Sequence, residues 1–300
     1  EAMTDFLRHN LEVYFLENKT EADKLSEQVL INKRSREKAE TTRLNLKKTL
    51  SSGTDLMSRV QSFVDCRSKK VEERELFIVE GKSAMGACIQ ARNPDFQAII
   101  PVRGKILNCL KAEYDKIFKN EIITDLIKVL GCGVEVRTKA NKDLSMFDLS
   151  LLRWNKVIIC TDADVDGFQI RTLILTMLYR LTPTLIEEGR VFIAETPLYE
   201  ISTKTDTYFA YNEQEKSDVL SELGDKKYTI QRSKGLGEND PDMMSLTTMN
   251  PATRRLVKVE PSEAEATAVM FETLLGDNLS GRKEFIADKG SLYLEMVDVS

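Results

Sequence analysis

Residues 157–172 read VIICTDADVDGFQIRT. An apolar run as long as a buried strand stops at Thr161, and Asp162, Asp164 and Asp166 then follow at alternate positions, closed by a glycine. Ionised carboxylates this close repel one another unless a cation or a basic group lies among them. The stretch therefore predicts a strand that ends at an acidic cluster with a cationic partner.

Similar apolar runs recur on both sides of this stretch, with helical patterns between them. We expect strands over 75–80, 96–102, 156–162 and 190–195, and helices over 83–92, 121–133 and 168–189. Strands that alternate with helices indicate an α/β fold, here a Rossmann-like parallel sheet flanked by helices.

Different patterns precede and follow this core. Residues 2–48 contain neither Gly nor Pro and predict one or two long helices. Their basic run, 33–48, is expected to be a solvated helix face, or alternatively a surface for DNA or a partner. The tail is expected to be mixed α+β, with strands over 207–212 and 227–232 and helices over 240–248, 262–275 and 281–288. These patterns predict domains over 1–68, 69–196 and 197–300, with a turn-rich break at 51–56.

The composition is that of an ordinary globular protein, with 300 residues, of which 42% are hydrophobic and 30% charged. No run approaches the roughly 18 apolar residues of a membrane span and no signal peptide opens the chain, so we expect a cytoplasmic location without membrane contact. The five cysteines form no C-x-x-C pair, which indicates a reduced chain without structural zinc.

The single histidine, His9, makes histidine-based catalysis improbable. The net charge of −5 argues weakly against nucleic-acid binding, although it says little about local charge.

Two familiar loop motifs are excluded. The residues from Asp162 match the first positions of a calcium-binding loop. The twelfth position, however, is Leu173, which has no oxygen ligand, and a strand precedes the loop where a helix is required. The sequence EGKS at 80–83 ends like a phosphate-binding P-loop, but the glycine needed five residues before Gly81 is Leu76.

A second acid ends a strand. Glu80 closes the strand over 75–80 as Asp162 closes the strand over 156–162. Ligands bind at the carboxyl ends of parallel strands, so Glu80, Asp162 and Asp164 converge if the two strands are neighbours. Carboxylates with water favour a hard divalent ion, and the expected bound metal is Mg²⁺ with phosphate as a co-ligand. Simple helix capping explains single acids but not both clusters.

Seven motifs follow one another along the chain: ELFIVEGKSA (75–84), FQAIIPVRGKILN (96–108), LGCGVE (130–135), TDADVDGFQIRTL (161–173), ETPLYEI (195–201), KGLGE (234–238) and TTMNPATRRLVKV (247–259). In this order they resemble the B subunits of bacterial type IIA topoisomerases, gyrase B and the ParE subunit of topoisomerase IV, whose metal-binding domain has the Toprim fold. The resemblance spans residues 70 to 290, and the helices before it resemble the end of that subunit's transducer region.

The resemblance implies half of an enzyme that cleaves and rejoins double-stranded DNA. An A subunit of the GyrA or ParC kind supplies the catalytic tyrosine in a heterotetramer, and only the full-length B subunit uses ATP. Glu80, Asp162 and Asp164 match the catalytic metal ligands, with Asp166 in support, for one or two Mg²⁺ ions. The expected DNA-binding residues are Lys82, Arg103, Lys105, Asn108, Gln169 and Lys234. Gyrase and topoisomerase IV are not distinguished.

Three positions depart from the family. Lys82 stands where an aspartate is common, Gln169 where a histidine is usual, and Ser233 where an aromatic residue is usual. Lys82 is expected to favour the ionised form of Glu80 or to contact a DNA phosphate. Two alternatives stay open: another Toprim enzyme, such as a primase or nuclease, and a non-enzymatic module that binds DNA or a protein through its N-terminal helices.

Overall fold

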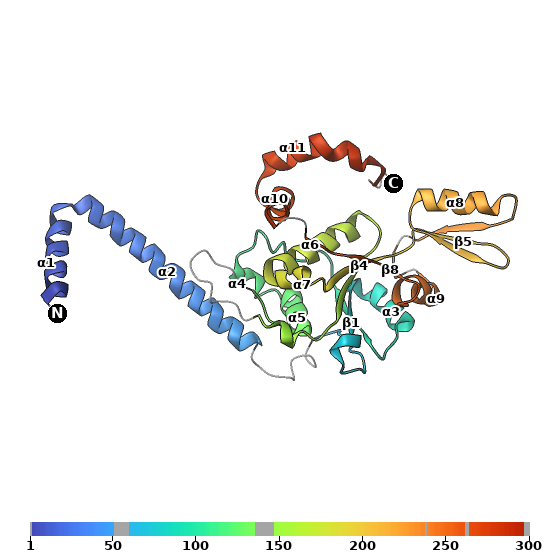
Figure 1. Cartoon of the computed structure of the whole chain (residues 1–300), viewed down its shortest axis with the longest axis horizontal. Helices are drawn as coiled ribbons and strands as arrows, with labels where there is room; N and C mark the ends of the chain where they lie inside the picture. Colours follow the sequence, from blue (N-terminus) through green and yellow to red (C-terminus); the bar gives the residue numbers. More distant parts are fainter. Residues whose placement is uncertain are drawn as a thin grey trace. The chain divides into compact units, whose positions relative to one another are not determined.

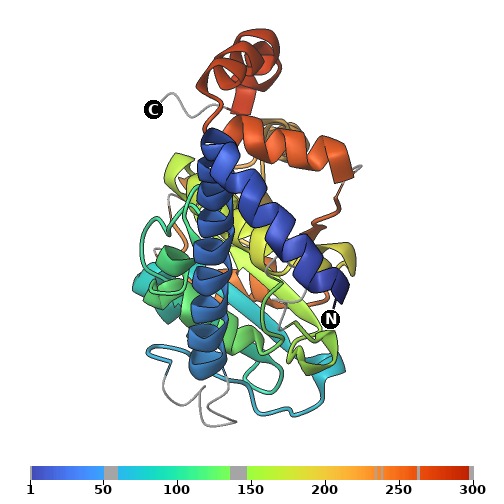
Figure 2. The ribbon, with the colours of Figure 1, turned by 90° about the vertical axis from the view of Figure 1, so that its left-hand side faces the viewer.

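The computed structural model describes residues 2–50, 60–135, 147–233, 235–237, 239–261 and 264–296. The chain divides into two compact units, Glu1–Ser52 and Gly53–Ser300. The first unit consists of α1 (Ala2–Glu17) and α2 (Lys19–Leu50), which meet at Asn18 (Figures 1 and 2). One or two long helices were predicted here, and the structure has two. The turn-rich break at 51–56 is not covered, because residues 51–59 lie outside the described residues.

The second unit is built on a five-stranded sheet in the order β2-β1-β3-β4-β8. Its strands are β1 (Glu75–Glu80), β2 (Gln97–Val102), β3 (Lys156–Cys160), β4 (Val191–Glu195) and β8 (Arg255–Lys258). The first four run parallel, as predicted, and β8 from the tail adds an antiparallel edge strand beside β4. Val79 lies opposite Cys160 and Glu80 opposite Val102, so Glu80 lies at the carboxyl-terminal edge of the sheet.

Helices cover both faces of this sheet. On one face lie α3 (Gly81–Ala91) and α9 (Pro241–Met244), and on the other α5 (Glu121–Leu130), α6 (Val165–Leu181) and α7 (Pro183–Glu187) (Figure 1). Phe77 and Val79 of β1 belong to the core on the α3 face, while Leu76 and Ile78 between them are also fully buried. Burial of both strand faces explains why these strands are continuous apolar runs, as parallel strands usually are.

The helix predicted over 168–189 is wrong in two respects. It begins earlier, at Val165, because the Asp164 side chain caps it by accepting a hydrogen bond from the Gly167 amide at 2.7 Å. It also ends earlier, at Leu181, because Pro183 has no amide hydrogen to continue the helix and instead begins α7.

The tail contains a second, smaller sheet. Its strands β5 (Tyr199–Ser202), β6 (Thr207–Ala210) and β7 (Thr229–Arg232) are antiparallel in the order β6-β5-β7, and α8 (Glu213–Leu223) packs on them. A π-helical turn at Ser245–Met249, α10 (Ala264–Leu275) and α11 (Leu279–Lys289) follow α9. Shorter elements are α4 (Tyr114–Ile117) and 3-10 turns at Val71–Glu73, Leu149–Leu151 and Gly290–Met296. The sequence predictions located β6 and β7 but missed β5, α8 and β8.

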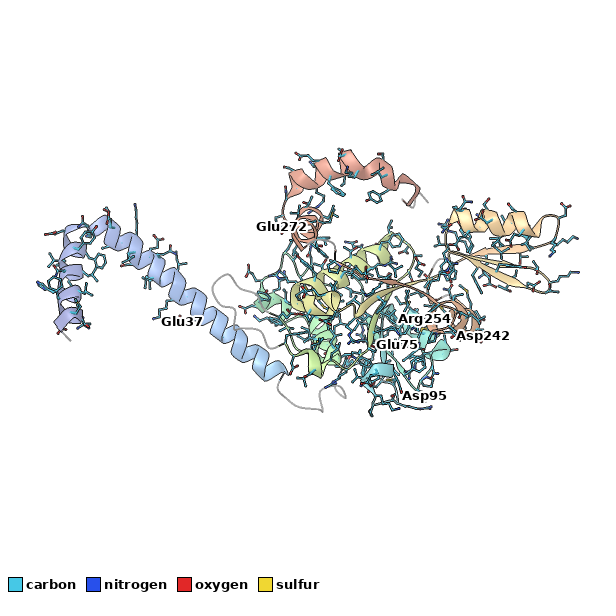
Figure 3. The ribbon with its side chains drawn as sticks, in the orientation of Figure 1. Glu37, Glu75, Asp95, Asp242, Arg254 and Glu272 are labelled. Carbon is cyan, nitrogen blue, oxygen red and sulfur yellow. The ribbon has the colours of Figure 1, made fainter. Side chains whose placement is uncertain are left out.

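A buried ion pair fastens the tail to the large sheet. Arg254, just before β8, donates two hydrogen bonds of 2.6 Å to the carboxylate of Glu75 at the start of β1 (Figure 3). Both side chains are 4% exposed. Burial alone would raise the pKa of Glu75, but the hydrogen bonds from Arg254 and Gln97 outweigh it and hold that pKa below its usual value. The domain boundary predicted between residues 196 and 197 stays a prediction. Strand β8, which lies after this boundary in the sequence, is part of the large sheet.

Candidate metal and DNA site

The first three parallel strands end at the same edge of the large sheet. Glu80 is the last residue of β1, and the loops after β2 and β3 carry Lys105 and Asp162. Gly81 has a φ of +75°, a left-handed conformation that lets the chain turn from β1 directly into α3. This edge is where α/β sheets bind their ligands.

Glu80 and Asp162 lie next to each other at this edge. The Glu80 Oε2 atom accepts a hydrogen bond of 3.2 Å from the Asp162 amide. Burial raises the pKa of the half-buried Glu80 carboxyl, and the charges of Asp162, Asp164 and Asp166 raise it further, against the opposing effect of that hydrogen bond. A cation at this point would offset both the burial and the repulsion. The two strand ends therefore meet, as expected from the sequence.

Asp164 and Asp166 are engaged elsewhere. Asp164 caps α6 through the Gly167 amide, and Asp166 forms an ion pair of 2.8 Å with Lys105. In the described parts of the chain, no group of three or more His, Cys, Asp or Glu side chains is arranged to hold a metal ion. Asp164 is close enough for its charge to raise the pKa of Glu80, but it does not join Glu80 and Asp162 in such a group.

The donor set nevertheless fits magnesium. Mg²⁺ keeps several waters and is usually bound through one or two carboxylates together with substrate phosphates, rather than in an all-protein cage. Glu80 and Asp162 supply two carboxylates at the correct edge, with oxygen ligands only. The assignment of metal ligands remains a prediction.

Gly167, which closes the aspartate motif, cannot be replaced by a residue with a side chain without a steric clash. A Cβ atom at Gly167 would lie 2.1 Å from the Asp162 carbonyl oxygen. The turn from β3 to α6 folds back on itself so closely that no side chain fits, and this keeps the three aspartates at the start of the helix.

Asp162 has a further partner that the sequence predictions missed. The Leu236 amide, in the KGLGE motif of the tail, donates a hydrogen bond of 2.8 Å to the Asp162 Oδ1 atom. The sequence predicts a DNA contact for this motif through Lys234, but Lys234 lies outside the described residues. The glycine-rich character of the motif was the signal that a close backbone approach was required.

The expected DNA-binding residues divide into two groups. Lys82, in the first turn of α3, is exposed, as are Lys105 and Gln169. Arg103 donates a hydrogen bond of 3.4 Å to the Ser62 hydroxyl, and Asn108 donates one of 3.0 Å to the Leu275 carbonyl at the end of α10. Asn108 therefore holds a tail helix in this structure.

A cavity of about 350 Å³ lies beside the acidic edge, between the loop after β2, α6 and the tail helices. Its polar lining comes from Lys105, Asn108, Lys111, Gln169, Thr172 and Arg282. Three of these side chains are cationic, and two of them are paired with acids, Lys105 with Asp166 and Lys111 with Asp277. Cationic groups therefore lie beside the carboxylates despite the acidic net charge.

The pKa of Glu80 is raised by burial and by the neighbouring aspartates. The expected effect of Lys82 on this carboxyl, and its contact with a DNA phosphate, stay predictions.

None of the helices in the described ranges combines the length and the apolar character needed to cross a bilayer.

Comparisons with known proteins agree with this architecture. Residues 75–196 match the Toprim domain, and residues 225–287 match the carboxyl terminus of the DNA gyrase B subunit. The DNA gyrase B subunit of Thermotoga maritima is 40% identical over 100% of this chain and 45% of its own length. The corresponding protein of Clostridium acetobutylicum is 42% identical over 97% of the chain and 44% of its own length. That of Thermus thermophilus is 44% identical over 77% of the chain and 36% of its own length.

The chain thus spans less than half the length of the curated relatives it matches. Its similarity to the Thermotoga maritima and Clostridium acetobutylicum proteins extends over nearly all of its own residues, and the matched Toprim region contains the whole acidic edge. The chain belongs to the family of type IIA DNA topoisomerase B subunits, which includes the DNA gyrase B subunit.

Proposed function

We propose that this chain is the part of a type IIA topoisomerase B subunit that takes part in cleaving and rejoining double-stranded DNA. An A subunit of the heterotetramer supplies the tyrosine nucleophile. The observation that carries the proposal is the contact between Glu80 and the Asp162 amide at the carboxyl-terminal edge of the Toprim sheet. Two acids from separate strands meet there beside cationic side chains.

Glu80 and Asp162 are the proposed ligands for Mg²⁺, with Asp164 and Asp166 as supporting acids for one or two ions. When bound, the metal supplies Lewis-acid stabilisation of charge on the scissile phosphate and on the departing 3′-oxygen. The raised pKa of Glu80 supports this role, because its causes are burial and carboxylate repulsion, which a divalent cation relieves.

Lys105 is the proposed phosphate contact nearest to these acids. Its ion pair with Asp166 joins two side chains that are 50% and 65% exposed. Exposed pairs of this kind contribute at most about 1 kcal/mol, so a DNA phosphate can displace Asp166 at little cost. Lys82 and Gln169, also exposed, are proposed to contact the same DNA segment.

Several features of the whole enzyme follow from the family. The three relatives are gyrase B subunits, which favours gyrase over topoisomerase IV for the holoenzyme. We assign ATP use to the full-length protein rather than to the residues of this chain. The five cysteines are free and buried, which fits the reducing conditions of the cytoplasm.

A DNA cleavage assay tests the proposal. The chain is mixed with GyrA or ParC, supercoiled DNA, Mg²⁺ and a drug that traps the cleaved complex. Loss of one ligand removes several kcal/mol of charge stabilisation, so Glu80→Gln should reduce cleavage by at least about 100-fold. Asp95→Asn is the matched control, because Asp95 is an exposed acid just before β2, at the opposite edge of the sheet (Figure 3).

Each outcome has a distinct meaning. Cleavage by Glu80→Gln at the level of the Asp95→Asn control contradicts the metal assignment. Nicking by the chain alone, without any A subunit, indicates a different class of Toprim enzyme. Stronger cleavage with GyrA than with ParC supports gyrase, and the reverse supports topoisomerase IV.

A further inference from the structure

We propose that residues 235–237, here called the glycine loop, position the Asp162 carboxylate and thereby set the metal affinity of the site. This inference rests on the proposed role of Asp162 as a metal ligand. It makes the glycine loop a positioning element that reaches the Toprim domain from the tail.

The glycine loop borders the Asp162 carboxylate. The Leu236 amide donates its hydrogen bond to Oδ1 at 2.8 Å. A Cβ atom added at Gly235 would be 3.1 Å from Oδ2 and 3.6 Å from Cγ, so the glycine leaves only enough room for the carboxylate. The carboxylate is therefore oriented by a donor on one oxygen, and a side chain at position 235 would press on the other.

The glycine loop is itself anchored to the elements that carry Glu80. The Leu236 side chain is 1% exposed and packs in the same core as Val79 and Ala84. Gly237 lies against the first turn of α3, where an added Cβ atom would be 2.6 Å from Ser83 Cβ and 3.1 Å from the Ser83 carbonyl carbon. Because α3 begins directly after Glu80, the glycine loop connects the surroundings of both proposed ligands.

This arrangement has a consequence for metal binding. A hydrogen bond from an amide favours the ionised carboxylate and fixes its orientation. Partners that orient a metal ligand in this way typically contribute a factor of about 10–100 to metal affinity. The glycine loop follows β7 (Thr229–Arg232) of the small sheet by only a few residues, so a displacement of that sheet would act directly on Asp162.

Two substitutions perturb the glycine loop in different ways. Gly235→Ala presses on the Asp162 carboxylate, and Gly237→Ala pushes the loop away from α3. Gly86→Ala is the matched control, because Gly86 also lies in the Toprim domain, in α3, and a Cβ atom there meets nothing within 4 Å. Adding Ser83→Gly to Gly237→Ala removes the 2.6 Å contact and should restore affinity in part.

The test measures Mn²⁺ binding by isothermal titration calorimetry on the whole chain, with thermal unfolding to verify folding. We expect Gly235→Ala and Gly237→Ala to raise the Mn²⁺ Kd about 10-fold, with Gly86→Ala unchanged. If Glu80→Gln weakens Mn²⁺ binding but both loop variants bind like wild type, the positioning role is wrong while the metal site stands. If the wild-type chain binds no Mn²⁺, or Glu80→Gln binds it as well as wild type, the proposed metal site fails and this role fails with it.

Hydrogen exchange tests the contact between Leu236 and Asp162 without any metal. Replacing Asp162 with alanine removes the acceptor of the Leu236 amide, so hydrogen exchange at that amide should accelerate, since coupling between two groups is reciprocal. Exchange at Leu236 that is equally slow in Asp162→Ala and in wild type would overturn the proposal.

Discussion

Replacing Arg254 with methionine should strongly destabilise the second unit, Gly53–Ser300, although Arg254 is distant in the sequence from β1, the strand that it contacts. Its guanidinium forms two hydrogen bonds of 2.6 Å with Glu75, and each side chain is only 4% exposed. Methionine fills a similar volume but leaves the Glu75 carboxylate buried without its main partner. The variant therefore isolates the contact that ties the tail to β1.

The size of the effect can be estimated from the structure. Breaking a buried ion pair by removing one partner costs about 3–5 kcal/mol. Glu75 keeps a hydrogen bond of 3.0 Å from Gln97 and an ion pair of 3.2 Å with Lys156, so we expect the lower end, about 3 kcal/mol. For a unit of this size the midpoint of thermal unfolding should fall by roughly 6–12 °C.

The effect should depend on pH in a defined direction. The pKa of Glu75 is lower in the folded state than its usual value, so its ionised form stabilises the fold above the usual carboxyl pKa of about 4.3. That stabilisation is lost as the pH falls through the lower folded pKa. The stability difference between wild type and Arg254→Met should therefore be largest near neutral pH and shrink in acid.

Urea and thermal unfolding followed by circular dichroism measure these quantities. The control is Arg255→Met, the same substitution at the next residue, where the ion pair with Glu215 joins side chains that are 46% and 31% exposed. That pair should contribute about 1 kcal/mol or less. The double variant Glu75→Gln/Arg254→Met should be less destabilised than the sum of the single changes. A loss in Arg254→Met no larger than in the control would refute the reasoning.

Three further outcomes follow from the same contacts. Gly167→Ala should destabilise the turn by about 1–3 kcal/mol, measured by urea unfolding, because its Cβ atom would lie 2.1 Å from the Asp162 carbonyl oxygen. Gly81→Ala should cost about 1 kcal/mol or slightly more in the same assay, since a Cβ atom there meets open space and only the positive φ of +75° opposes it. Thiol labelling of the native chain should be slow at Cys109 and Cys132, because burial raises the pKa of each to about 12, and fast labelling of either under native conditions would contradict that burial.

The parallel sheet could be predicted from the sequence because its signals are local. Both faces of β1 and β3 are buried, so the strands are continuous apolar runs whose limits coincide with the observed ones within two residues. The helix predicted over 121–133 begins as predicted but ends earlier, at Leu130, because Gly131 adopts the left-handed conformation at which helices commonly end. The order of the strands then brought Glu80 to Asp162.

The remaining features depend on contacts between distant parts of the chain. The Leu236 amide reaches Asp162 across 74 residues, and a backbone donor leaves no trace in side-chain patterns. Asn108 was expected at DNA but donates to the Leu275 carbonyl, 167 residues away. The capping role of Asp164 was missed, since the same residue type serves as a metal ligand and as an N-cap.

The location of a bound metal tests the central claim most directly. Crystals of the chain soaked in Mn²⁺ would reveal the ion by its anomalous scattering, and a second data set from Glu80→Gln crystals provides the comparison. We predict a peak within coordination distance of the Glu80 and Asp162 carboxylates at the carboxyl-terminal edge of the sheet, weakened or absent in Glu80→Gln. A peak elsewhere, or one at this edge that is unchanged in Glu80→Gln, would contradict the assignment.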